Sequence, residues 1–182
     1  MPRIPLITDK SDLPAEQHAE FDAIVEVLHG VRGPFALLLR SPGLAEKVMR
    51  AGAQVRLGSQ LTSAERELAI LAVSREKDAA YEWNAHVKVG RQGGLSEETI
   101  DAVRNRADVS GLPENERDIV TYVRQLLRTN RVEQDVYDRL VERHGARWMV
   151  ELAATVGQYQ YIAAINNTFE VEPPPGADPL PM

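Results

Sequence analysis

The chain has 182 residues, 43% of them hydrophobic and 26% charged, which is typical of one well-packed globular domain and excludes an intrinsically disordered chain. Its formal charge is -6 and its arginines are scattered among acidic residues, which argues against a surface that binds nucleic acid. The absence of cysteine excludes disulfides, thiolate metal sites and thiol redox cycles.

The first third of the chain predicts an extended lead-in followed by helices. Residues 1–14 contain three prolines separated by polar residues and are expected to be extended. Apolar residues recur at three- and four-residue steps over residues 15–29, which predicts an amphipathic helix closed by a glycine. Residues 31–40 are expected to form a loop or short helix. The Ser-Pro pair that opens residues 41–58 predicts an N-cap and the first position of another helix.

The middle of the chain carries the clearest helix signals. Thr62 and Glu65 have the spacing of a capping box, and the run at residues 68–73 is apolar nearly all round, so we expect a central buried helix. A second helix is predicted over residues 79–92, where two glycines stop it. A third is predicted over residues 96–106, whose serine and two glutamates suit a helix N-terminus.

The last third of the chain continues the helical pattern and then changes in composition. Helices are predicted over residues 114–128, 134–143 and 147–169, and no segment alternates as a strand would. The proline-rich tail at residues 171–182 is expected to be extended and either free or laid across a neighbouring subunit. We therefore predict an all-α domain of about seven to nine helices over residues 15–170.

The helix predicted over residues 79–92 carries the residues best suited to chemistry. Glu82 and His86 lie one turn apart near the centre of an apolar arc that includes Trp83. Burial would raise the pKa of the carboxyl group, and the pair could then exchange protons near neutral pH. The same spacing also fits a contact between helices in which two buried polar side chains satisfy each other.

Other residues could extend this site. Glu67, on the predicted central helix, faces either an intersubunit salt bridge or the same pocket. With Glu82 and His86 it could supply three metal ligands, but the second histidine that zinc usually takes is missing, and we expect no metal and no cofactor. Four aromatic residues could line a small-molecule pocket or, equally, the core or a subunit interface: Trp83, Trp148, Tyr159 and Tyr161.

Three segments carry a resemblance to a known family. They are RELAILAV at residues 66–73, YEWNAH at residues 81–86 and GGLS at residues 93–96, all within a core motif at residues 61–106. This block resembles the carboxymuconolactone decarboxylase family, within the alkylhydroperoxidase D-like superfamily. The resemblance extends to SPGL at residues 41–44 and to the last helix, and it implies the helical fold of that superfamily.

The resemblance also implies a chemistry. Alkylhydroperoxidase relatives have a glutamate, a Cys-x-x-Cys pair and a histidine where this chain has Glu67, Ala79, Glu82 and His86, so peroxidase activity of the peroxiredoxin type is not expected without the cysteines. The decarboxylase-like branch, which acts in the catabolism of aromatic compounds, loses carbon dioxide from a carboxylated unsaturated lactone without a cofactor. It implies a lyase or isomerase with His86 as the acid, Glu82 orienting or recharging it, and Glu67 in the same site.

Partners and location follow from the same observations. Tyr81, Trp83 and Asn84 flank the pair and are expected to contact a small-molecule substrate, while the resemblance implies a homo-oligomer, either trimer or hexamer. No apolar run is close to the length of about 20 residues that spans a bilayer, and the first residues lack the apolar core of a secretory signal. We expect a cytoplasmic protein without membrane or nucleic-acid partners. A non-catalytic oligomeric binding protein on the same scaffold is the alternative.

Overall fold

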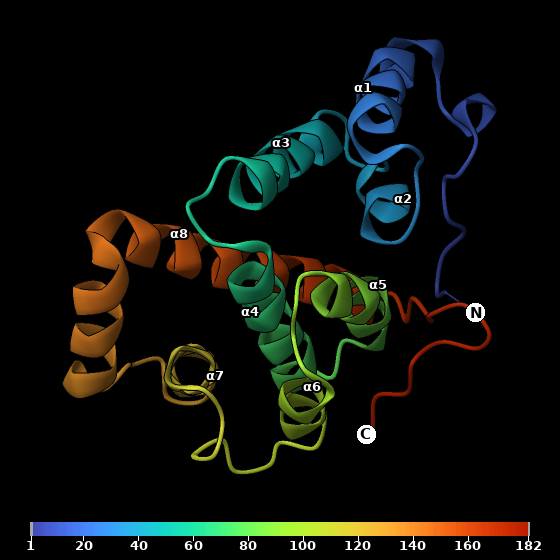
Figure 1. Ribbon diagram of the computed structural model, residues 1–182. Coiled ribbons are helices and arrows are strands. Elements are labelled where there is room, and N and C mark those ends of the chain that lie inside the picture. The colour runs from blue at the N-terminus through green and yellow to red at the C-terminus, as the bar shows by residue number, and fades with distance from the viewer. Residues whose placement is uncertain (1, 182) are drawn as a thin grey trace.

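The computed structural model describes residues 2–181, and within that range the chain forms eight α-helices and no strand. The helices follow two short 3-10 turns and are, in order, α1 His18–Leu28, α2 Pro34–Leu38, α3 Leu44–Leu57, α4 Ser63–Glu76, α5 Ala80–Gln92, α6 Glu97–Arg104, α7 Glu114–Thr129 and α8 Gln134–Thr168 (Figure 1). The prediction of an all-α fold is confirmed. None of these helices is both long and apolar enough to cross a membrane.

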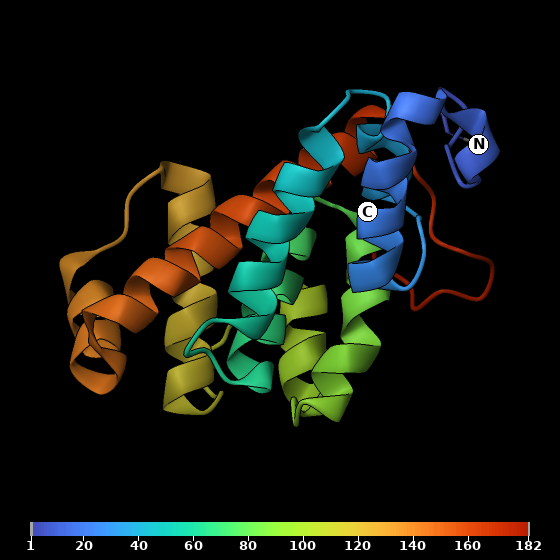
Figure 2. The ribbon, with the colours of Figure 1, turned by 90° about the horizontal axis from the view of Figure 1, so that it is seen from above.

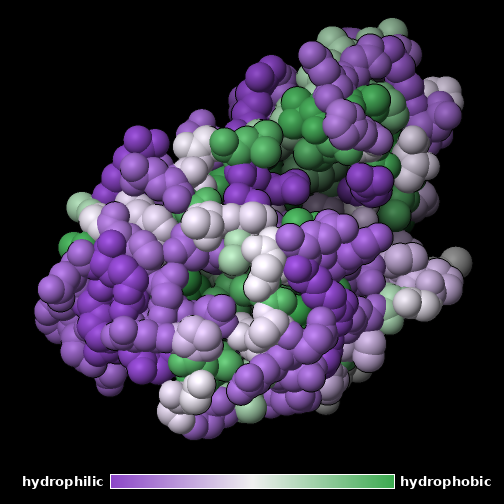
Figure 3. Space-filling view, viewed as in Figure 1, coloured by the Kyte–Doolittle hydropathy of each residue, from purple (hydrophilic) through white to green (hydrophobic). Residues whose placement is uncertain are grey.

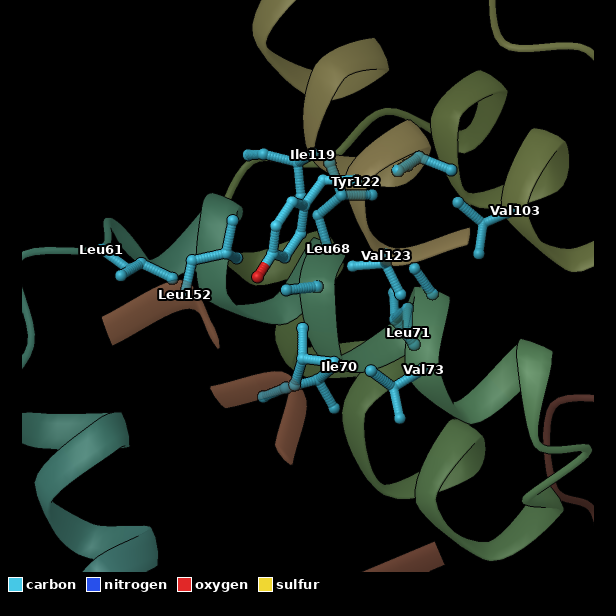
Figure 4. Packing of buried hydrophobic residues seen from close by; sticks show 14 of the residues in the cluster. Leu61, Leu68, Ile70, Leu71, Val73, Val103, Ile119, Tyr122, Val123 and Leu152 are labelled. Carbon is cyan, nitrogen blue, oxygen red and sulfur yellow. The ribbon is translucent and has the colours of Figure 1, made fainter. Parts of the chain in front are cut away.

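Helix α4 lies at the centre of the main hydrophobic core. All residues from 68 to 73 are buried, and α5, α6, α7 and α8 pack around them. The predicted capping box is present, because Thr62 Oγ1 accepts from the Glu65 amide at 3.2 Å and the Glu65 carboxylate accepts from the Thr62 amide at 2.8 Å. Figure 4 shows side chains of α4 facing those of α7 and α8, among them Leu68, Ile70, Leu71, Ile119, Tyr122, Val123 and Leu152.

A second, smaller hydrophobic cluster joins α1, α2, α3 and the N-terminal segment. It contains Ile7, Phe21 and Ile24, and Ile165 of α8 packs against its edge. In Figure 1 these three helices form the upper part of the molecule, and Figure 2 shows α3 crossing α8, with which it is in contact. The molecule therefore has two packed units whose boundary runs along α3, α5 and α8.

The start of α3 differs from the prediction. The helix begins at Leu44 rather than at Ser41 and Pro42, and its N-cap residue is Gly43, in the left-handed region at φ 74. The side-chain cap comes from α1, because the Glu20 carboxylate accepts from the Gly43 amide at 2.8 Å and from the Glu46 amide at 3.1 Å. A carboxylate at a helix N-terminus satisfies free N–H groups and the helix dipole, so α1 fixes where α3 begins.

Helix α8 combines the last two predicted helices. Hydrogen bonding continues from Gln134 to Thr168, but Gly145 has φ 85 and ψ 167, which is not helical. The two predicted segments therefore exist, and they meet at a bend that Figure 1 shows in α8. Glycine adopts this backbone conformation at little cost.

The proline-rich tail lies against its own chain and is not free, which was one of the two expectations. The Asp178 carboxylate accepts from Arg91 Nη1 at 2.9 Å and from Arg104 Nη2 at 2.7 Å, and its amide donates to Asn84 Oδ1 at 3.2 Å. The tail is therefore tied to α5 and α6. Just before the tail, Glu170 forms an ion pair with Arg3 of the N-terminal segment. Figure 1 shows both chain ends on the same side of the molecule.

Candidate functional site

A cavity of about 760 Å³ lies at the boundary between the two packed units. One wall comes from α1, the start of α2 with the segment before it, and one face of α3, and the other comes from α5 and α8. Pro174 of the tail lies at its edge. Figure 3 shows apolar side chains gathered between α1 and α3, above the level of α5. The volume falls within the range of small-molecule sites, roughly 300–1,000 Å³.

The imidazole of His86 is held from behind by Glu67. Its Nδ1 lies 2.7 Å from Glu67 Oε2, and the other carboxylate oxygen of Glu67 accepts from Arg66 Nε at 3.2 Å. Burial raises the pKa of Glu67, but the hydrogen bond and charge of His86 and the Arg66 guanidinium outweigh it and hold that pKa below its usual value. An ionised Glu67 can only accept a hydrogen bond, so it fixes the hydrogen on Nδ1.

Glu82 stands on the other side of the same ring. Its Oε2 lies 3.6 Å from His86 Nε2, and its Oε1 accepts from Asn166 Nδ2 at 2.7 Å. Burial raises the pKa of Glu82, and the charges of His86 and Arg56 and the Asn166 hydrogen bond offset this only in part. The site therefore contains two glutamates with pKa values moved in opposite directions, on either side of one histidine.

An aromatic ring completes the wall beside the histidine. Tyr159 of α8 meets His86 edge-on, with ring centroids 4.9 Å apart and planes at 89°. Burial raises the pKa of its hydroxyl, so it stays protonated and can donate a hydrogen bond. Of the other aromatic candidates, Trp148 lies in the core stacked on His144, and Tyr161 is partly exposed outside the cavity.

The structure separates the sequence-predicted residues into two groups. Glu82, His86, Tyr81 and Asn84 line the cavity. Glu67 does not line it and acts behind His86 rather than facing solvent or the cavity.

Trp83 also lies outside the cavity, contrary to the expectation that it contacts a substrate. It is fully buried in the main core, with Arg104 5.5 Å above its ring. Neighbouring residues on a helix point about 100° apart, so Trp83 faces the core while Glu82 faces the cavity.

The two glutamates do not converge on one point. Glu67 contacts the Nδ1 side of the His86 ring and Glu82 the Nε2 side. Within residues 2–181 no group of three histidine, aspartate or glutamate side chains is arranged to hold a metal ion.

Several polar residues of this site were not predicted from the sequence. Arg32 and Arg56 line the cavity, and Asn166 holds Glu82. The small residues Gly52 and Ala53 on the same face of α3 are the one sequence signal that could have pointed to Arg56, since they leave space along that face. Asn166 gives no such signal, because it is 84 positions away from Glu82.

Comparison with known protein families gives a match over part of the chain. The sequence model of the carboxymuconolactone decarboxylase family matches residues 42–125, which include Glu67, Glu82 and His86. No curated protein matches the chain.

Several solved structures share the fold. A peroxidase-related protein from Silicibacter sp. TM1040 is 20% identical with a TM-score of 0.74, covering 96% of this chain and 94% of its own. A peroxidase-related protein from Ralstonia eutropha JMP134, described as an alkylhydroperoxidase AhpD core, is 19% identical with a TM-score of 0.75, covering 96% and 93%. The debrominase Bmp8, solved as a cysteine-to-alanine variant with 2,3,4-tribromopyrrole, is 13% identical with a TM-score of 0.67, covering 96% and 95%.

At these identities the structural likeness concerns the fold alone. The match to the family model, by contrast, covers Glu67, Glu82 and His86. Over residues 42–125 the chain is similar to the carboxymuconolactone decarboxylase family.

Proposed function

We propose that the protein is a cofactor-independent lyase or isomerase that moves a proton to or from a small carboxylated or lactone substrate. The observation that carries this proposal is the row formed by Glu67, His86 and Glu82, which ends at the cavity. Pairs of acids with pKa values moved apart are typical of sites that use one group as a fixed charge and the other as a proton carrier.

Each member of the row has a distinct role in the proposal. Glu67 stays ionised and keeps the hydrogen on Nδ1 of His86, so Nε2 is the atom that accepts or delivers the proton. Burial raises the pKa of Glu82, which suits this carboxyl group to carry a proton beside Nε2. Their separation of 3.6 Å is too long for a hydrogen bond, so both groups remain open to a substrate atom in the cavity.

The proposed row can serve either reaction without another reactant. In a lyase, the bond to the departing carboxylate breaks, its electron pair moves into the conjugated carbonyl, and His86 or Glu82 protonates the carbon. In an isomerase, His86 removes a proton from one carbon and the row returns it to another. Peroxide reduction by thiols is not proposed, because the chain contains no cysteine.

The test is solvent deuterium exchange. A panel of carboxylated and neutral unsaturated lactones is incubated with the protein in D2O, and exchange at carbon is followed by NMR, which detects proton transfer even without net turnover. We expect exchange with wild type and a loss of about 100-fold or more in His86→Gln and Glu82→Gln. His144→Gln, at a histidine outside the cavity, is the matched control and should exchange like wild type.

Two results would contradict the proposal. One is exchange that persists in both site variants, which would place the chemistry elsewhere. The other is no exchange with any lactone, together with variants that only melt at lower temperature, which would favour a non-catalytic binding protein.

A further inference from the structure

The cavity carries a charge opposite to that of the whole protein. The chain has a formal charge of -6, yet the cavity is lined by two arginines, Arg32 and Arg56, and by one carboxyl group, Glu82. The two arginines therefore outnumber the carboxyl groups of the lining, and burial raises the pKa of Glu82, which adds to this excess of positive charge. A cationic cavity in an acidic protein attracts small anions and repels small cations.

Of the two arginines, Arg56 is the half-buried one and Arg32 is exposed. It stands on α3 in the face that borders the cavity together with Met49, Gly52 and Ala53. Its Nε atom is buried and has no hydrogen-bond partner among residues 2–181. Arg50, six residues earlier on α3, is by contrast paired with Glu46 at 2.6 Å. A buried N–H without an acceptor is costly and is usually satisfied by a ligand, an ion or water.

The position of Arg56 places a bound anion next to the Glu67, His86 and Glu82 row. Its charge lowers the pKa of both Glu82 and Tyr159, so the guanidinium faces the same end of the cavity as those side chains. The contacts of the Glu82 carboxyl group are with His86 and Asn166, so this carboxyl group does not occupy the fork of Arg56. Close packing of α3 on α8 maintains this arrangement, because Gly52 lies where a Cβ would approach Gln158 Nε2 to 3.2 Å.

We propose that Arg56 is the residue that binds a carboxylate of the substrate and thereby selects carboxylated molecules over neutral lactones. Arg32, exposed at the rim beside Tyr81, adds a second positive charge on the way in. The assignment rests on the proposed function for its catalytic meaning, but the anion site itself is a property of the cavity. In a decarboxylation the carboxylate on Arg56 is one that stays on the molecule, because a cation holding the departing group would stabilise the ground state.

The test is binding of matched acids and amides, measured by isothermal titration calorimetry. The probes are cinnamate and cinnamamide, sorbate and sorbamide, and 2-furoate and 2-furamide, in which only the charge of the carboxyl group changes. We expect the acid of at least one pair to bind wild type about 10-fold or more tightly than its amide. Arg56→Gln should weaken binding of that acid about 10- to 100-fold and leave the amide unchanged.

Two further variants sharpen the test. Arg56→Lys keeps the charge but loses the planar fork, so its affinity for the acid should fall between those of wild type and Arg56→Gln. Arg50→Gln removes an arginine of the same helix outside the cavity and should bind all probes like wild type.

Any of three results would overturn the assignment. The acids could bind no better than their amides, or Arg56→Gln could leave the affinity for the acid unchanged. The third is a Kd above about 1 mM for every acid. Because binding is measured without turnover, the two proposals fail separately. Binding that depends on Arg56 without any deuterium exchange would overturn the proposed function alone, whereas exchange that depends on His86 with binding indifferent to Arg56 would overturn this assignment alone.

Discussion

The two glutamates beside His86 should respond in opposite ways to removal of their charge. Glu67→Gln keeps the shape of this fully buried side chain. It replaces a carboxylate that accepts hydrogen bonds from both His86 and Arg66 with a neutral amide. Hydrogen bonds to charged groups are worth about 1.5–3 kcal/mol, and in a chain of this size 1 kcal/mol shifts the melting temperature by about 2–4 °C. We expect Glu67→Gln to melt about 3–12 °C lower at neutral pH.

Glu82→Gln should not lower the melting temperature at the same pH. The amide oxygen still accepts from Asn166, and a neutral side chain avoids the cost of ionising a buried carboxyl group. The variant should therefore be as stable as wild type or more stable.

The pH dependence follows from the direction of each pKa shift. The pKa of Glu67 is lowered, so its stabilising effect is complete above the ordinary value of 4.5 and is lost as the pH falls through the lowered value. The pKa of Glu82 is raised, so above 4.5 the unfolded chain loses this proton first and stability falls with rising pH. The deficit of Glu67→Gln should narrow below pH 4.5, and the relative stability of Glu82→Gln should increase above it.

Thermal unfolding followed by circular dichroism between about pH 4 and pH 8 measures both effects. Glu46→Gln, which removes a carboxylate from an i,i+4 pair near the surface of α3, is the control and should change stability by about 0.5 kcal/mol or less. If Glu67→Gln melted like wild type, or if the two variants followed pH in the same sense, the opposite pKa shifts of the two glutamates would be refuted.

Three other substitutions test features around the site. Glu20→Ala removes the side-chain cap of α3 and should cost about 1–2 kcal/mol in urea unfolding, and an unchanged midpoint would contradict the capping role. Asp178→Asn breaks the two ion pairs of the tail and should speed proteolysis of the last residues while changing global stability by about 1 kcal/mol or less; an unchanged cleavage rate would contradict the tether. Gly33→Ala places a Cβ against the Tyr81 ring at φ +54, so it should displace that ring and alter probe affinity, and a variant that binds like wild type would contradict this contact.

Local signals predicted most helix positions in this chain, and tertiary contacts explain where they did not. Thr62 and Glu65 satisfy each other within one turn, so their spacing was sufficient to place the start of α4. Ser41 has the right residue type for an N-cap, but the free amides of α3 are instead satisfied by Glu20, which is distant in sequence. A cap supplied by another helix leaves no trace in the local pattern.

The same distinction applies to the candidate site. Glu82 and His86 share α5, so their spacing alone predicted that they lie together. The orientation of Glu67 could not be predicted, because it depends on how α4 packs on α5, and the structure resolves it in favour of His86. Trp83 shares the apolar arc of α5, yet packing divides that arc between the main core and the cavity.

The boundary between the two hydrophobic clusters has a consequence for ligand entry. The cavity lies between α1, α2 and α3 on one side and α5 and α8 on the other, and each side packs around its own cluster. A small outward displacement of the first three helices would widen the entrance while the interior of both clusters stays dry. The cost of admitting a ligand is then set by the side chains that cross the boundary, such as Ile165, and is separate from the free energy of unfolding.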